Sequence, residues 1–253
     1  MPLWRIRLYR AKRLGMDELT FERDGDTIRG VVARPSGAGP FPALVIIPDV
    51  FGVSEHYRDV ARRFAAEGFF TYVIDLYSRE GAPQLPDMAA VFAWIAALPD
   101  ARVLADLDGA VRLLSTHADV REEALGITGF CLGGQYALMA ACTAPRLRVC
   151  VSWYGMLRYA EITALKPASP LDLAAGLRCP YLGLFGAEDG LIPQADVETL
   201  RTILARQRQP FEIKLYPGAG HAFFNDARPD TYRPAAAADA FPRAVRFLRQ
   251  HLA

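Results

Sequence analysis

The sequence has no long hydrophobic run and no excess of either charge. None of its apolar stretches approaches the roughly 18–20 residues that a membrane-spanning helix needs, so we expect no membrane partner. Its 29 basic and 28 acidic residues give a formal net charge of +1, so no global field attracts nucleic acid. With 52% hydrophobic and 23% charged residues, the 253-residue chain has the composition of an ordinary globular protein, which excludes disordered, collagen-like and coiled-coil chains.

Cysteine is also scarce. The four cysteines form no CxxC pair and are too few for a disulfide framework in a chain of this size: Cys131, Cys142, Cys150 and Cys179. Zinc ribbons and thioredoxin-type motifs are therefore excluded, and the histidines and cysteines show no metal-ligand spacing. We expect no cofactor or metal, a reducing cytoplasmic location, and a monomer or small homo-oligomer.

The first thirteen residues are basic, but no apolar segment follows them, so they do not read as a secretory signal. We find neither an internal repeat nor a low-complexity linker. We therefore interpret residues 1–15 as a basic N-terminal extension and residues 16–253 as a single domain.

What the chain does contain is an alternation of short apolar runs with amphipathic segments of helix length. The predicted strands are Leu19–Arg23, Ile28–Arg34, Ala43–Pro48, Phe69–Asp75, Ala124–Phe130, Arg148–Tyr154, Tyr181–Phe185 and Phe211–Tyr216, the last alternating and so nearer a sheet edge. The predicted helices are Glu55–Ala66, Asp87–Ala97, Leu104–Thr116, Leu132–Cys142, Gln194–Arg206 and Asp239–His251. This order predicts an α/β fold with a mostly parallel, doubly wound sheet and helices on both faces. The irregular segment Met156–Arg178 follows a strand end and is a candidate lid or pocket wall.

The most informative motif is the run from Gly129 to Gly134, Gly-Phe-Cys-Leu-Gly-Gly, between a predicted strand and a predicted helix. In a G-x-nucleophile-x-G elbow the central residue sits on a strained turn, so its neighbours two positions away must lack side chains. The elbow would present the Cys131 thiol at a helix N-terminus, with the Leu132 amide as an oxyanion donor. Cys131 could instead be a packed core cysteine, because free cysteine is often buried and glycine-rich turns also serve other purposes.

A cysteine nucleophile needs a base and an acid that orients the base. His221 lies in a small-residue loop after the last predicted strand. His56, in the loop-to-helix passage Gly52–Arg58, could approach a pocket, but a position on a helix surface suits it better. Asp189 follows the strand Tyr181–Phe185, and its neighbour Glu188 could take the same role. The order nucleophile, acid, base, each past a strand end, is that of the α/β-hydrolase triad.

With these motifs in place, the sequence resembles the dienelactone hydrolase (carboxymethylenebutenolidase) family of α/β hydrolases from about Leu19 to Leu252. The resemblance is carried by five motifs: Pro48-Asp49-Val50-Phe51-Gly52-Val53, Ile74-Asp75-Leu76-Tyr77, the elbow with cysteine in place of the commoner serine, Gly186-Ala187-Glu188-Asp189, and Gly220-His221-Ala222-Phe223. It implies hydrolysis of a lactone or carboxylic ester through a thioester on Cys131, with His221 as base and Asp189 as acid.

The resemblance also assigns roles to the loop that follows the strand Ala43–Pro48. The Val50 amide would be the second oxyanion donor beside Leu132. Family members place a glutamate before that amide, where it interacts with the resting thiol; this chain has the shorter Asp49, so that contact could be lost or bridged by water. Asp49 could also simply brace the loop.

Substrate-binding residues carry over less well. The family's arginine four residues after the catalytic histidine is replaced by Asn225, and Arg228 is the nearest alternative. Arg79 is the only arginine between Tyr77 and Trp94 that could act as a second clamp, although a surface position suits it better. Trp153 and Tyr154, at a strand end, are candidate pocket walls or core residues. The partner is expected to be a small lactone or ester.

Two other functions remain open from the sequence. A glutaminase-type amidohydrolase uses a similar elbow but pairs its cysteine with His-x-Glu, and here the residue two after His221 is Phe223. A non-catalytic α/β-hydrolase scaffold that binds a small molecule would not need all three triad residues. Faster alkylation of Cys131 than of the other cysteines would distinguish an enzyme from such a scaffold.

Overall fold

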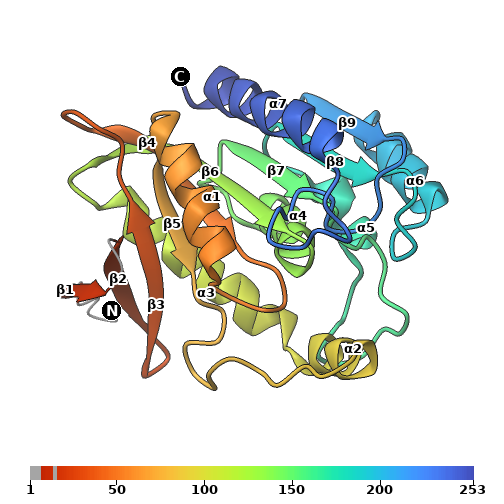
Figure 1. Ribbon diagram of the computed structural model, residues 1–253, viewed down its shortest axis with the longest axis horizontal. Helices are drawn as coiled ribbons and strands as arrows, with labels where there is room; N and C mark the ends of the chain where they lie inside the picture. The colour runs from red at the N-terminus through yellow and green to blue at the C-terminus, as the bar shows by residue number, and fades with distance from the viewer. Residues whose placement is uncertain (1–6, 14–15) are drawn as a thin grey trace.

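Nine strands form one sheet in the computed structural model, which describes residues 7–13 and 16–253 (Figure 1). The strand order is β1-β2-β3-β5-β4-β6-β7-β8-β9. The strands are β1 (Arg7–Arg13), β2 (Met16–Arg23), β3 (Asp26–Ala33), β4 (Phe41–Ile47), β5 (Phe70–Ile74), β6 (Val120–Phe130), β7 (Val149–Trp153), β8 (Tyr181–Gly186) and β9 (Phe211–Tyr216). The helices are α1 (Glu55–Ala66), α2 (Met88–Ala97), α3 (Asp100–Ser115), α4 (Leu132–Thr143), α5 (Pro170–Leu173), α6 (Gln194–Leu204) and α7 (Pro234–Leu252), with a 3-10 turn η1 at Ala174–Gly176.

The sheet is parallel from β5 through β9 and antiparallel where β1, β2 and β3 join β5. β5, β7 and β8 are buried along their whole length, because helices cover both of their faces. β9 alternates buried and half-buried residues and lies at the sheet edge, as its sequence pattern predicted. The predicted α/β class with a mostly parallel sheet is therefore confirmed.

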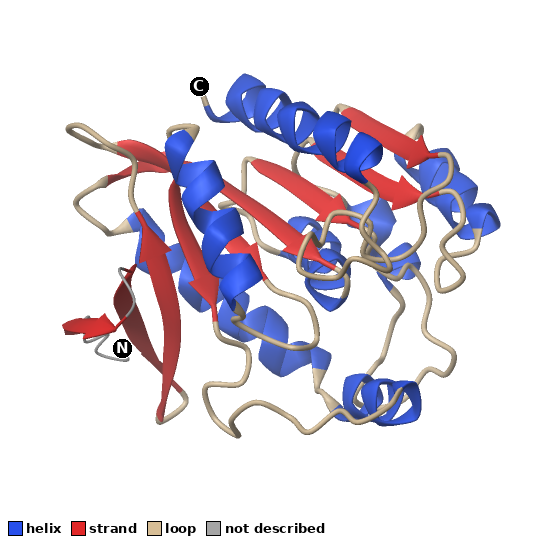
Figure 2. Ribbon diagram, viewed as in Figure 1, coloured by secondary structure: helices blue, strands red, loops and turns tan. Residues whose placement is uncertain are grey.

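Helices cover the sheet in two layers (Figures 1 and 2). α1 and α7 lie together on one face, where Phe64 and Phe241 bring their ring centroids to 4.9 Å, and α3 and α4 lie on the other. α2 lies away from the sheet, on the side toward which the central strands point. Within the described part of the chain no single helix is long and apolar enough to cross a membrane; α2 and α3, bent by 76°, meet those limits only as a pair.

Every predicted strand and helix is present, but several elements begin earlier than their apolar patterns indicate, and the difference is largest for β6, α3 and α7. β6 begins at Val120 and runs through the exposed residues 121–123 before it enters the core. α3 begins at Asp100, and α7 begins at Pro234, where proline at the first helical position is favourable. The segment predicted as irregular, Met156–Arg178, is interrupted by α5 and η1.

The predicted N-terminal extension, residues 1–15, falls partly outside the described residues, which exclude 1–6 and 14–15. The described part, β1, pairs antiparallel with β2 and forms one edge of the sheet. β2 and β3 extend the sheet beyond β5, and residues 7–13 add one further strand at that edge.

Candidate active site

Cys131 occupies a strained turn between β6 and α4. Its backbone angles are φ 55° and ψ −116°, and residues other than glycine rarely adopt a positive φ. The flanking glycines are required by close backbone packing. A Cβ on Gly129 would lie 2.0 Å from the Gly133 carbonyl oxygen, and one on Gly133 would lie 2.1 Å from the Ile47 oxygen. The spacing that predicted a nucleophile elbow therefore corresponds to an elbow in the structure.

The same close packing brings the loop after β4 beside the N-terminus of α4. Among the described residues, neither the Leu132 nor the Val50 amide donates a hydrogen bond. The Val50 carbonyl accepts a hydrogen bond from the Tyr77 hydroxyl at 2.6 Å, which fixes the orientation of this loop. Two unpaired amides beside a nucleophile are the arrangement that an oxyanion hole needs.

His221 and Asp189 meet past the ends of β9 and β8. The His221 Nδ1 lies 2.8 Å from Asp189 Oδ2, and the Asp189 side chain is fully buried. Asp189 Oδ1 also accepts a hydrogen bond from the Leu191 amide. The sequence allowed Glu188 the same role, but Glu188 is exposed. The His221 Nε2 is buried, and a hydrogen bond links the His221 side chain to that of Cys131.

Charge couples His221 to Cys131. Burial alone would lower the pKa of His221, but the charge of Cys131 and the hydrogen bond to Asp189 outweigh it and raise this pKa to about 10. Cys131 is half-buried, whereas the other three cysteines are buried. Burial raises the pKa of the Cys142 and Cys179 thiols to about 12, so these groups stay protonated at neutral pH.

Tyr154 closes one side of this arrangement. It adopts φ 37° directly after β7, and its ring packs edge-on against His221 with centroids 5.3 Å apart. Its buried hydroxyl has no hydrogen-bond partner among the described residues. Burial raises the pKa of Tyr154 well above its usual value, so the hydroxyl is a neutral group held close to the triad. The candidate role of Tyr154 as a pocket wall is compatible with this position.

Asp49 is buried beside the triad and has partners other than the thiol. It accepts a hydrogen bond from the Phe51 amide at 2.9 Å and one from the Tyr57 hydroxyl, and it lies 3.6 Å from the Arg228 guanidinium. Burial raises the pKa of Asp49, and the charge of Arg228 partly opposes that shift. No described contact joins Asp49 to Cys131, so its observed contacts are those of a residue that braces the loop.

Arg228 does reach the site, as the sequence allowed. Its guanidinium lies over the Phe51 ring at 4.4 Å and beside Asp49, and its side chain is about two-fifths exposed, at 39%. Asn225 stands at the position of the family's arginine, but its side chain is used within the local turn. Its side-chain oxygen accepts a hydrogen bond from the Ala227 amide and so shapes the turn that follows His221.

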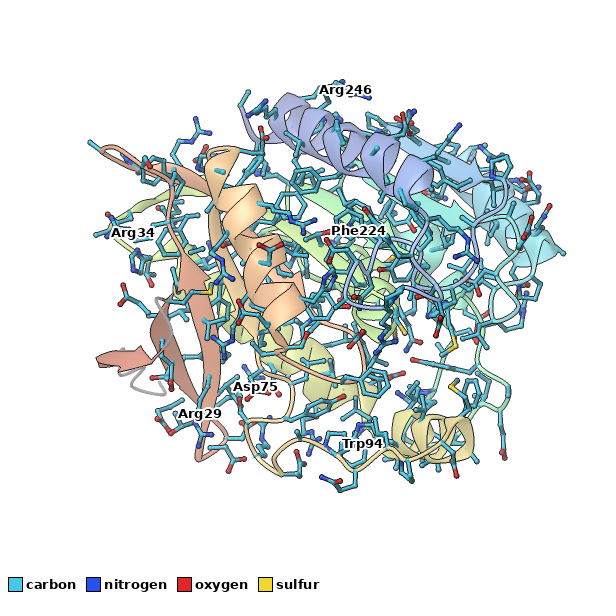
Figure 3. The ribbon with its side chains drawn as sticks, viewed as in Figure 1. Arg29, Arg34, Asp75, Trp94, Phe224 and Arg246 are labelled. Carbon is cyan, nitrogen blue, oxygen red and sulfur yellow. The ribbon has the colours of Figure 1, made fainter. Side chains whose placement is uncertain are left out.

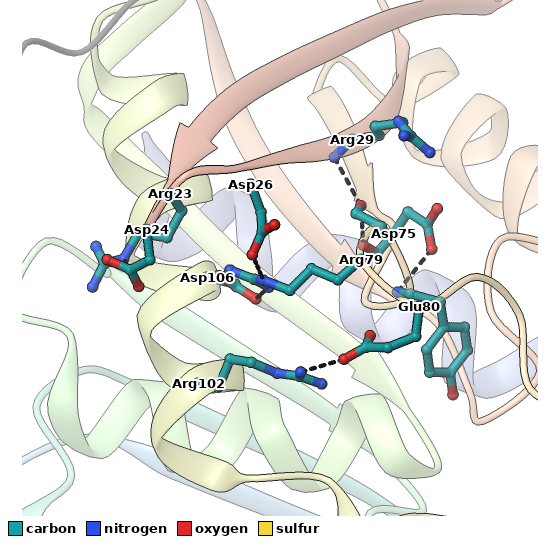
Figure 4. Close-up of polar contacts among 11 residues, drawn as sticks. Arg23, Asp24, Asp26, Arg29, Asp75, Arg79, Glu80, Arg102 and Asp106 are labelled. Atoms are coloured by element: carbon teal, nitrogen blue, oxygen red, sulfur yellow. Dashed lines mark hydrogen bonds and ion pairs between the residues drawn. The ribbon is translucent and has the colours of Figure 1, made fainter.

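The structure corrects the expectation for Arg79 and favours the core alternative for Trp153. Arg79 is neither a surface residue nor a clamp, because its guanidinium binds Asp106 through two hydrogen bonds and Asp26 through a third (Figure 4). Trp153 is wholly buried: its ring stacks on Phe130, and its Nε1 donates to Thr128. Arg79 therefore joins the start of β3 to α3, and Trp153 is a core residue.

His56 lies near the site, as one of its two alternatives allowed, and the expectation that it lies on a helix surface is wrong. Its side chain is only 2% exposed, and its Nδ1 lies 3.0 Å from Asp226 Oδ1. Arg63, on the same helix, binds the other oxygen of Asp226. Helix α1 thus holds the turn that follows His221. The only local signal was the position of His56 just after the loop that carries Val50.

No group of three or more His, Cys, Asp or Glu side chains in the described ranges could hold a metal ion. The chemistry open to the observed residues is nucleophilic: a cysteine at a helix N-terminus, an imidazole oriented by a buried carboxylate, and two unpaired amides. Such a constellation suits acyl transfer.

Comparison with known proteins agrees with this geometry. The profile of the "Dienelactone hydrolase family" matches residues 28–252. A Bradyrhizobium protein named "Probable 2-oxo-3-(5-oxofuran-2-ylidene)propanoate lactonase" is 38% identical over 96% of this chain and 97% of its own length. An Escherichia coli K12 protein named "Putative carboxymethylenebutenolidase" is 40% identical over 90% of this chain and 84% of its own length.

A solved structure gives the same result. The crystal structure of a "Putative Dienelactone Hydrolase" from Klebsiella pneumoniae has a TM-score of 0.87 and 38% identity, and the match covers 93% of this chain and 98% of the other. Fold, length and sequence agree across nearly the whole domain. This chain therefore belongs to the dienelactone hydrolase family of α/β hydrolases.

Proposed function

We propose that this chain is a cysteine-dependent hydrolase of lactones and carboxylic esters, with Cys131 as nucleophile, His221 as base and Asp189 as the acid that orients it. The observation that carries the proposal is the 2.8 Å contact between His221 and Asp189, beside a cysteine in a strained elbow. The names of two relatives, a lactonase and a carboxymethylenebutenolidase, favour a small lactone or ester as substrate.

The first half of the reaction acylates Cys131. The thiolate attacks the substrate carbonyl carbon, and the carbonyl π electrons move to oxygen, where the amides of Leu132 and Val50 donate hydrogen bonds. When the tetrahedral intermediate collapses, the ester C–O bond breaks and the leaving oxygen takes the proton from His221 Nε2. The raised pKa of His221 supports this step, because the ring carries a proton that it can give up.

The second half releases the acid. Neutral His221 takes a proton from a water molecule, and the resulting hydroxide attacks the thioester carbon. Collapse of the second intermediate breaks the C–S bond, and thiolate and imidazolium are restored. Asp189 keeps Nδ1 protonated, so that Nε2 is free to exchange the proton with the reacting groups.

Asp49 and Tyr77 act on this reaction through the loop that carries Val50. Asp49 holds the Phe51 amide, and Tyr77 holds the Val50 carbonyl, so the Val50 amide is preorganised toward the oxyanion. We assign Asp49 to this bracing role, because its observed partners are the loop amide, Tyr57 and Arg228.

The test compares hydrolysis of a neutral aryl ester and of a carboxylated dienelactone by wild type, Cys131→Ala and Cys142→Ala. We expect Cys131→Ala to lower kcat/KM by about a thousandfold or more for any substrate that is cleaved, because the thioester route is lost. Cys142→Ala, a buried cysteine outside the elbow, should retain activity and serves as the matched control. An acid-quenched acyl-enzyme, mapped to Cys131 by mass spectrometry, is also expected. Full activity in Cys131→Ala would refute the mechanism.

A further inference from the structure

A cavity of about 560 Å³ lies next to the triad and has no role in the reaction as described. Its size is within the range of small-molecule sites, roughly 300–1,000 Å³. Its walls come from α2, from the segment 156–166 and from the loop that follows Asp189, and they include Phe92, Ile95, Met156, Tyr159, Leu191 and Pro193. The lid or wall segment predicted from sequence therefore lines a cavity.

Two walls of this cavity are anchored on the triad itself. The Leu191 amide donates a 2.9 Å hydrogen bond to Asp189, the carboxylate that holds His221. On the other side, Met156 comes two residues after Tyr154, whose ring packs against His221. These two walls therefore adjoin the pair formed by Asp189 and His221.

Helix α2 joins the cavity to the oxyanion loop. Phe92 and Ile95 line the cavity. Trp94, labelled in Figure 3, does not line it and brings its ring centroid to 5.7 Å from that of Tyr77. Tyr77 in turn holds the Val50 carbonyl. One face of α2 therefore lines the cavity, and the opposite face supports the loop beside the nucleophile.

The cations that line the cavity are already paired. The Lys166 ammonium donates to Asp100 at 2.6 Å and to the Tyr136 hydroxyl at 2.8 Å, and its side chain is buried. Arg158, which is exposed, binds Asp196 through Nε at 3.2 Å. A carboxylate that entered the buried part of this cavity beside Lys166 would lose its hydration without gaining a free cationic partner there, which is unfavourable.

Exposed apolar side chains gather on the segments that wall the cavity, and one of them, Phe92, lines it. Four of the five large hydrophobic side chains that remain exposed among the described residues lie on α2 or on the segment 156–166: Met88 (52%), Phe92 (42%), Ile162 (53%) and Leu165 (43%). An exposed apolar patch around a concave site is typical of binding to an apolar ligand.

We propose that this cavity binds the apolar part of a neutral ester or lactone, and that the enzyme prefers such substrates to carboxylated lactones of similar size. The inference rests on the proposed function and defines its substrate class. It follows from three observations together: walls that adjoin the Asp189–His221 pair, a buried lysine that is already paired, and exposed apolar side chains on the segments that wall the cavity.

The experiment measures kcat/KM for p-nitrophenyl acetate, p-nitrophenyl hexanoate and the mono-p-nitrophenyl ester of adipic acid, which has the length of hexanoate and a terminal carboxylate. A second series varies the alcohol at a fixed acetyl group. Wild type is compared with Ala96→Trp, which fills the cavity, and with Ala97→Trp, the adjacent exposed residue that does not line it. We expect wild type to favour the longer neutral ester of at least one series over the acetate, and hexanoate over the adipate ester, each by about tenfold or more.

In Ala96→Trp the preference for the longer neutral ester should fall by about tenfold, whereas Ala97→Trp should keep the wild-type ratio. Three results would overturn the inference: a flat length profile in both series, preference for the adipate ester, or identical ratios in the two tryptophan variants. The proposed function fails separately, if wild type cleaves no ester or if Cys131→Ala remains active.

Discussion

His56 shows how one side chain can tie a loop to a helix. Its ring is buried between α1 and the turn after His221, where it contacts Asp226 at 3.0 Å. Burial lowers the pKa of His56, and the opposing effect of Asp226 is smaller. The ring is therefore neutral in the native state near neutral pH and gains a proton more readily once the chain unfolds.

We expect the free energy of unfolding to decrease as the pH falls below about 6.5, the ordinary pKa of histidine, because the unfolded chain then binds a proton that native His56 resists. The slope from one such group is at most about 1.4 kcal/mol per pH unit. Urea unfolding at pH 5 to 8 measures it. His56→Gln, which cannot titrate, should show a shallower decrease than wild type; equal slopes would contradict the assignment. Asp226 has a lowered pKa, so its contribution is lost only at more acidic pH.

At the scale of elements, the site depends on how tightly α4 meets the end of β4. A Cβ on Gly133 would lie 2.1 Å from the Ile47 oxygen and 2.6 Å from the Pro48 oxygen, and neither backbone group can move without shifting the sheet or the oxyanion loop. The elbow and the loop that carries Val50 therefore have a fixed relation.

We expect Gly133→Ala to lower the free energy of unfolding by about 1–3 kcal/mol, as overpacking does, and to lower kcat/KM by about a hundredfold through displacement of the oxyanion amides. Gly176→Ala is the matched control, because its Cβ would have nothing closer than 3.7 Å. Denaturant unfolding and ester hydrolysis measure the two effects. A Gly133→Ala enzyme with wild-type activity would show that the contact is not needed.

The helices and strands could be predicted from the sequence wherever residues close together in the chain determine them. The apolar runs of β5, β7 and β8 are continuous because both faces are buried, and the glycines around Cys131 are set by a single turn. The start of α3 was missed, since Asp100 is stabilised there by Lys166, 66 residues later. Arg79 was misplaced for the same reason: its partners lie on other elements, 27 and 53 residues away.

At the scale of the whole molecule, a buried ion pair holds the segment that walls the cavity. Lys166 and Asp100 are each about 97% buried in their side chains, at 2% and 3% exposure, and the Tyr136 and Tyr159 hydroxyls complete their hydrogen bonds. The Asp100 amide also binds the Leu165 carbonyl. The wall segment is therefore fixed to α3 and α4 rather than to the sheet beneath it.

Breaking this pair should be costly, because a charge would remain buried without its counter-ion. We expect Lys166→Met to lower the free energy of unfolding by about 3–5 kcal/mol. Arg158→Met, which removes an exposed cation of the same segment from Asp196, should cost under about 1 kcal/mol and is the control. Denaturant unfolding of both variants makes the comparison.

The double variant Lys166→Met with Asp100→Asn decides whether the cost comes from the uncompensated charge. If it does, the second substitution removes the charge that the first has isolated, so the double variant should be less destabilised than the sum of the two single ones. Strict additivity would mean that the two side chains stabilise the molecule independently. In that case the wall segment would be held by the tyrosine hydroxyls and its apolar contacts, and the ion pair would contribute little to its position.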